Sequence, residues 1–133
     1  MVQRPMRSKL DGGMIRRHAA AAAGILVCLA ALLAFRAAYV DAREWGATCA
    51  AGGPPWPCLP REALVWLQYW SLWGLGALAL GIGAFLTGWL PVGAASIAVG
   101  AMAVANYNAT WGVLGAALGL WVWIRAGNGV GED

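Results

Sequence analysis

The sequence contains 133 residues, of which 61% are hydrophobic and only 11% are charged. A soluble domain of this length needs about a quarter of its residues charged to cover its surface. These values exclude a water-soluble monomer, a disordered chain and a nucleic-acid-binding protein. We predict a single-domain, all-α integral membrane protein with four transmembrane helices in a small bundle, and three helices as the alternative.

The chain begins with a basic segment, residues 1–18, which holds five Lys or Arg and one Asp, a net charge of +4. Since Lys and Arg concentrate in cytoplasmic segments, we expect the N-terminus to be cytoplasmic. The first predicted span runs from Ala19 to about Tyr39. It resembles the apolar region of a signal peptide, but its length favours an uncleaved span. Within it, Arg36 is expected to extend to the interface, and Cys28 to lie in the protein core.

Residues 41–62 form the predicted external loop, with two Arg against three Asp or Glu, a net charge of −1. Cys49 and Cys58 enclose AAGGPPWP, a stretch in which Pro and Gly argue against a regular element. Two nearby thiols outside a bacterial membrane are expected to form a disulfide. We interpret this bond as structural; the alternative is a redox-active pair, although such pairs usually have two intervening residues and this one has eight.

A run of 62 residues without charge separates Glu62 from Arg125. Gly88 with Pro91, and then the turn-forming residues 106–108, are the predicted breaks. The resulting helices are about Arg61–Thr87, Trp89–Ala105 and Ala109–Ile124. These three and the first span make up a domain at residues 19–125, followed by a short tail at residues 126–133. Four spans place the C-terminus in the cytoplasm, whereas three place it outside.

Small residues recur at four-residue intervals along these helices. In lipid, such patterns allow close helix packing, which is a main source of helix association. We therefore expect helix contacts at Gly81, Gly83, Gly100, Gly112, Gly115 and Gly119. Because the small residues occupy more than one face of the helices, we also expect an interface with another protein.

Nine Trp residues are present, and most fall where aromatic residues gather at the two membrane interfaces. Trp66, Trp70 and Trp73 have the spacing of one helix face. We interpret this face as lipid-facing or partner-facing; the alternative is a stacking surface for a bound lipid, quinone or carotenoid. The polar residues available to complete such a surface are Gln68, Ser71, Asn106, Tyr107 and Asn108.

Function is predicted mainly from what the spans lack. They hold no Asp, Glu or Lys, which proton-coupled transporters normally need, and we expect no catalytic residue, no metal site and no intrinsic cofactor. His18, the single histidine, is interpreted as an interfacial residue. The leading prediction is a non-catalytic accessory subunit of a larger respiratory or photosynthetic complex in a bacterial inner membrane. The alternatives are a small oligomeric transporter or channel and, third, a membrane thiol oxidoreductase using Cys49 and Cys58.

Overall fold

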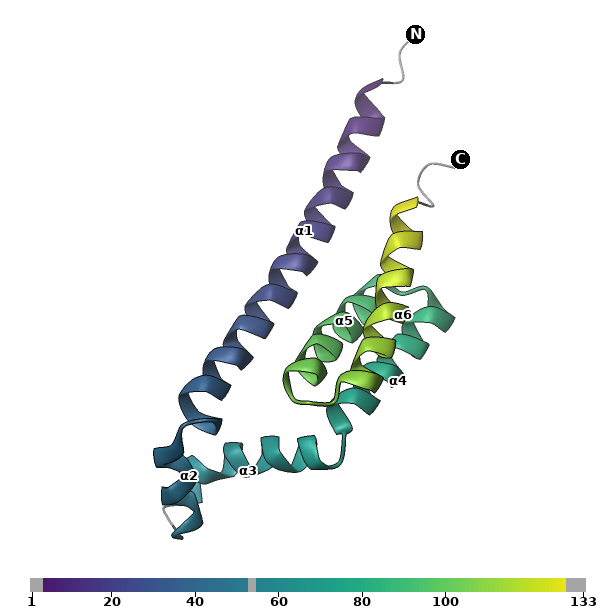
Figure 1. The fold of residues 1–133 in the computed structure, drawn as a ribbon. Helices are drawn as coiled ribbons and strands as arrows, with labels where there is room; N and C mark the ends of the chain where they lie inside the picture. The colour runs from purple at the N-terminus through teal and green to yellow at the C-terminus, as the bar shows by residue number, and fades with distance from the viewer. Residues whose placement is uncertain (1–3, 53–54, 129–133) are drawn as a thin grey trace.

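The structure, a computed structural model, describes residues 4–52 and 55–128. Every regular element in these two ranges is a helix, as predicted. In chain order they are α1 (Arg4–Phe35), the π-helix η1 (Arg36–Val40), α2 (Arg43–Ala50), α3 (Pro55–Tyr69), α4 (Leu72–Thr87), α5 (Leu90–Ala105) and α6 (Ala109–Asn128). Figure 1 shows that α1 and α5 run in one direction and α4 and α6 in the other, so α1 begins at the end of the molecule where α6 finishes.

Helix α1 is longer than the predicted first span. It begins at Arg4, so most of the basic N-terminal segment is helical and continuous with the apolar part. α1 packs mainly along α5. Cys28 is exposed, and the prediction that it lies in the core is wrong, because α1 contacts the other helices along one side.

The predicted helix Arg61–Thr87 is not continuous. It breaks at Trp70 and Ser71, and α3 and α4 meet at a bend of 66°. Ser71 has a left-handed backbone, with φ 55° and ψ 24°, which a helix cannot contain. α3 therefore lies across the direction of α4 and links it to α2 (Figure 1).

Helices α4, α5 and α6 form a closely packed three-helix core. Each buries four residues, all small except Val122, at alternating spacings of three and four, a pattern that keeps them on one face of a helix. On α4 they are Gly74, Ala77, Gly81 and Ala84; on α5 Gly93, Ser96, Gly100 and Ala103; on α6 Gly112, Gly115, Gly119 and Val122. The largest fully buried side chain in the described ranges is that of Ser96. Backbone therefore lies against backbone in this core.

The two predicted turns of the core are present. Gly88 ends α4 with φ 66°, the left-handed conformation that glycine adopts without a steric penalty. Between α5 and α6, Tyr107 has the positive φ of 61°, a position for which asparagine is the more favourable residue.

Two described stretches, Gly12–Val40 and Ala109–Asn128, are long and apolar enough to cross a membrane. The bent pair Trp56–Tyr69 and Leu72–Thr87 makes a third if it is counted as one span. α5 is apolar but has 16 residues, about 24 Å of helix, which is close to the lower limit for spanning. These helices are those expected of a membrane protein.

Candidate functional site at the disulfide end

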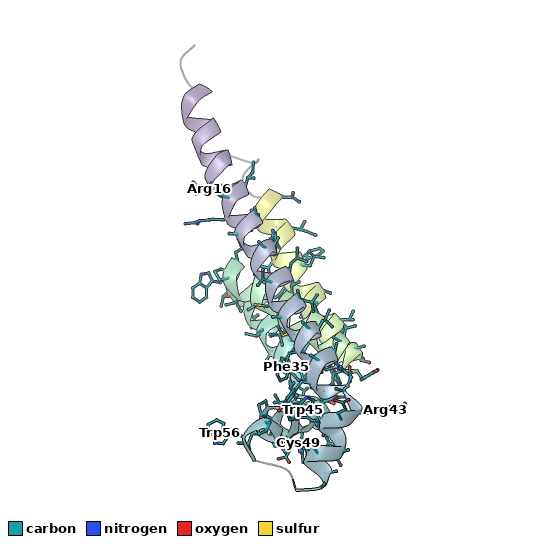
Figure 2. The ribbon with its side chains drawn as sticks, turned by 90° about the vertical axis from the view of Figure 1, so that its left-hand side faces the viewer. Arg16, Phe35, Arg43, Trp45, Cys49 and Trp56 are labelled. Atoms are coloured by element: carbon teal, nitrogen blue, oxygen red, sulfur yellow. A yellow bond between two sulfur atoms is a disulfide. The ribbon has the colours of Figure 1, made fainter. Side chains whose placement is uncertain are left out.

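We call the region formed by η1, α2, α3 and the α5–α6 turn the disulfide end. Cys49 and Cys58 are bonded there, as predicted, with their Cα atoms 5.6 Å apart. Figure 2 shows Cys49 with Trp45 and Arg43 at this end, whereas Arg16 lies toward the other end of α1. The disulfide joins α2 to α3, and Cys58 is only 6% exposed.

The prediction that the residues between the two cysteines form no regular element is wrong at both ends of that stretch, while residues 53–54 lie outside the described residues. α2 extends to Ala50, and α3 begins at Pro55. Proline is compatible with the first turn of a helix, where the backbone N–H has no partner in any case. Because the first turn of a helix accepts proline, this Pro-rich stretch can begin α3. Pro60 lies further inside α3 and removes one helical hydrogen bond.

Aromatic contacts hold α2 and α3 against the end of α1. The Tyr39 ring lies 5.3 Å from the Phe35 ring and 4.8 Å from the Trp45 ring, measured between centroids. The Tyr39 hydroxyl donates a hydrogen bond to the Pro57 carbonyl oxygen. Tyr39 thus connects η1 with both α2 and α3.

Arg36 connects α1 with the α5–α6 turn, a role that its position in the sequence did not suggest. Its guanidinium donates to the carbonyl oxygen of Ala105 and to Asn106 Oδ1, at 2.9 Å for the latter. It also forms an ion pair with Asp41, at 3.3 Å between Nε and Oδ2. The guanidinium carbon lies 5.1 Å from the centroid of the Tyr107 ring. The Arg36 side chain is 13% exposed, so its guanidinium lies largely within the protein.

The polar residues predicted to gather at one end do so. Asn106 is 4% exposed, accepts from Arg36 and donates to the Met102 carbonyl oxygen at 2.8 Å. Asn108 donates to the Gln68 carbonyl oxygen at 3.2 Å. That carbonyl lies at the end of α3, so the α5–α6 turn stabilises the break between α3 and α4. Sequence reasoning placed these residues at one end but not in one hydrogen-bonded cluster.

The three tryptophans predicted to share a helix face do not share one helix. Trp66 and Trp70 lie on the α3 side of the break, with ring centroids 6.4 Å apart, and both are exposed. Trp73 is on α4, and its indole Nε1 is buried without a hydrogen-bond partner in the described ranges. A continuous stacking face of Trp66, Trp70 and Trp73 is therefore absent, because the 66° bend separates them.

Five of the six glycines predicted at helix contacts lie where a Cβ atom would collide with another helix. A Cβ on Gly115 would lie 2.3 Å from the Ala77 carbonyl carbon. The corresponding shortest distances are 2.6 Å for Gly81, Gly100 and Gly112 and 2.5 Å for Gly119. Gly83 differs, since nothing lies within 4 Å of its Cβ position. Gly83 faces away from the core.

Ser96 lies at the centre of the three-helix core. Its hydroxyl oxygen is 2.9 Å from the Ala77 carbonyl oxygen on α4 and 2.7 Å from that of Gly115 on α6. A hydroxyl that reaches two neighbouring helices fixes their register. Ser96 lies three residues after Gly93 and four before Gly100, a spacing that keeps the three residues on one helix face.

Two open grooves lie near the ends of the molecule. The first, about 330 Å³, is lined by Arg61, Glu62, Val65, Trp66 and Tyr69 of α3. The second, about 230 Å³, lies between α4 and α6 and is lined by Phe85, Gly88, Trp121, Val122, Arg125 and Ala126. The His18 ring lies 5.4 Å from the Trp123 ring, which places the middle of α1 beside the last turns of α6.

Residues 4–52 and 55–128 contain no group of three or more His, Cys, Asp or Glu arranged to hold a metal ion. No protein-family model, no curated protein and no solved structure matches the chain.

Proposed function

We propose that this chain is a four-span protein of a bacterial inner membrane and a non-catalytic accessory subunit of a larger membrane complex, of the respiratory or photosynthetic type. In this proposal α1 with η1, α4, α5 and α6 cross the membrane. The N-terminus and the end of α6 are cytoplasmic, and the disulfide end is periplasmic.

The distribution of charge supports this orientation. Arg16 and Arg17 lie in the first half of α1, and Arg125 lies near the end of α6, at the same end of the molecule. The disulfide end carries Asp41, Glu44 and Glu62 against Arg36, Arg43 and Arg61, so it has no excess of positive charge. Lys and Arg near the ends of spans are enriched on the cytoplasmic side, and a disulfide is stable on the periplasmic side.

The main support for an accessory role is the small residues exposed on the outward face of α4. Gly83 has open space beside it, and Ala79, one turn earlier, is exposed. Pairs of small residues four apart are typical of helix–helix contacts in lipid. The other small residues of α4 at this spacing, Ala77 and Gly81, are already used inside the core, which leaves the Ala79–Gly83 pair for another protein.

The interior of the core favours a packing role over transport by a single copy. The backbones of Gly81 and Gly115 meet there, since a Cβ on Gly81 would lie 2.6 Å from the Gly115 carbonyl oxygen, and the Ser96 hydroxyl lies against the same oxygen. Such packing leaves no space for a solute between the three helices. Similarly, the burial of Cys58 favours a structural disulfide, because redox-active cysteines need access to their partners.

The test is the size of the assembly that contains the chain. Native membranes are extracted with a mild detergent, and the tagged full chain is followed on native gels. We expect a band well above the size of the chain alone and of its dimer. Gly83→Leu should move most of the chain out of that band, because the added side chain occupies the proposed contact.

Gly127→Leu is the matched control, since nothing lies within 4 Å of the Cβ position of Gly127 either and it lies at the end of α6. This variant should stay in the large assembly. A wild-type chain that migrates alone contradicts the accessory role, and so does a Gly83→Leu variant that assembles like the wild type.

A further inference from the structure

The groove along α3 has a combination of side chains that the proposed function does not explain. Its lining residues Arg61, Glu62, Val65, Trp66 and Tyr69 bring a cation, an anion and two aromatic rings together on one side of a helix. We propose that this groove binds the head group of phosphatidylethanolamine from the periplasmic leaflet. This inference rests on the membrane location given in the proposed function.

Arg61 supplies the site for phosphate. Its Nε atom is buried and has no hydrogen-bond partner in the described ranges, and no ion pair is formed with it there. Burying a guanidinium N–H without an acceptor is unfavourable. Arg61 lines the groove, and a guanidinium can donate two parallel hydrogen bonds to a phosphate group placed there.

The guanidinium of Arg61 lies beside Gly46 of α2. A Cβ on Gly46 would lie 3.4 Å from an Nη atom of Arg61, so Arg61 rests against the α2 backbone. Since the disulfide joins α2 to α3, this contact holds Arg61 at the groove. The cation is thus positioned by the fold instead of being a free surface side chain.

Glu62 selects the kind of head group. It is the neighbour of Arg61 and lines the same groove, so an anionic lipid would meet a negative charge beside its phosphate. Ethanolamine carries an ammonium group a few atoms from the phosphate and can pair with the Glu62 carboxylate. The charge pattern of the groove therefore complements a zwitterionic head group.

Trp66 and Tyr69 match the depth at which a head group lies. They are 57% and 80% exposed, and amphipathic rings of this kind prefer the membrane–water interface. α3 is bent by 66° from α4, so it runs across the proposed spans at the disulfide end (Figure 1). A helix in this orientation with an aromatic face lies in the plane of the interface.

The experiment measures lipid binding to the purified full chain by native mass spectrometry. The probes are phosphatidylethanolamine and phosphatidylglycerol of equal chain length, together with inorganic phosphate as a competitor. We expect phosphatidylethanolamine to bind at least fivefold more tightly than phosphatidylglycerol. Arg61→Gln should weaken its binding at least fivefold, and Glu62→Gln should remove the preference between the two lipids.

Arg43→Gln is the matched control, because Arg43 is exposed on α2 at the same end and does not line the groove. It should bind like the wild type. Unchanged binding by Arg61→Gln overturns the proposal, as does equal loss in Arg43→Gln. Displacement of the lipid by millimolar inorganic phosphate also overturns it, because the site would then be a free-phosphate site. Circular dichroism and an intact disulfide establish that each variant is folded.

A photoreactive side chain at Trp66 in native membranes distinguishes a lipid from a protein in the groove. Crosslinking to phosphatidylethanolamine is expected, whereas crosslinking to a protein overturns the proposal. Arg61-dependent lipid binding by a chain that forms no larger assembly contradicts the proposed function alone. Assembly without Arg61-dependent lipid binding contradicts the lipid site alone.

Discussion

At the scale of single residues, Arg36 and Ser96 each join helices that are distant in the sequence. Arg36 bonds to Asn106 and to the Ala105 carbonyl oxygen, where α5 ends. The last carbonyl groups of a helix have no partners within it, so a cation at this point satisfies them and also favours the negative end of the helix dipole. Ser96 reaches the backbones of α4 and α6. Both side chains therefore link helices by hydrogen bonds, whereas the small residues around them make only short van der Waals contacts.

Replacement of Arg36 tests this connection. Arg36→Met keeps an unbranched apolar stem but removes the guanidinium and every hydrogen bond that it donates, and it leaves Asn106 Oδ1 buried without that donor. We expect the free energy of unfolding to fall by about 2–3 kcal/mol. The measurement is reversible unfolding of the full chain in mixed micelles. Arg16→Met, at an exposed position of the same helix, should change it by less than about 0.5 kcal/mol. Equal effects of the two substitutions would refute the connection.

At the scale of the elements, glycine determines how closely α4, α5 and α6 approach. The Cβ position of Gly115 lies 2.3 Å from both the carbonyl carbon and the oxygen of Ala77, and a rigid backbone cannot move aside as a side chain can. The same physical reason explains the break at Ser71. After the break, Gly74 of α4 lies against the start of α6, with its Cβ position 3.2 Å from the Asn108 carbonyl oxygen.

A pair of glycine substitutions separates core contacts from open positions. Gly115→Ala should lower the free energy of unfolding by at least about 2 kcal/mol, because α4 and α6 must separate to admit the methyl group. Gly83→Ala, with nothing within 4 Å, should leave it unchanged or raise it by up to about 1 kcal/mol, because alanine is the better helix former. Unfolding in mixed micelles measures both variants. If they have the same stability, the backbone contacts of the core are not as described.

At the scale of the whole molecule, the chain consists of a closely packed core and a more loosely attached remainder. α4, α5 and α6 contact one another extensively, whereas α1 packs mainly on α5, and α2 and α3 contact the rest chiefly through η1 and the start of α4. The disulfide lies in this remainder, as Figure 2 shows for Cys49. Its contribution should therefore be local, since it constrains α2 and α3 but not the core.

Removal of the disulfide tests this division. The double variant Cys49→Ala, Cys58→Ala should destabilise the α2–α3 unit by about 2–3 kcal/mol, the entropic value for so short a loop. Limited proteolysis should then cleave between residues 43 and 60 at least tenfold faster. The thermal midpoint of the core should not change. Cys28→Ser, an exposed position on α1, serves as the control and should behave like the wild type. A core that melts earlier in the double variant contradicts the division.

Local chemistry in the sequence determined the helical class, the long apolar helices, the turns at Gly88 and at residues 106–108, and the pairing of Cys49 with Cys58. Each of these depends on residues that are close in the sequence: apolar runs, helix breakers and a short loop between two thiols. Tertiary structure alone decided the break at Ser71, the partners of Arg36 and the outward position of Gly83. No glycine or proline marks the break, and it forms because α4 must align with α5 and α6. The contacts in this protein depend on how closely α4, α5 and α6 approach one another. That distance is set by the packing of all three backbones and cannot be read from any one segment.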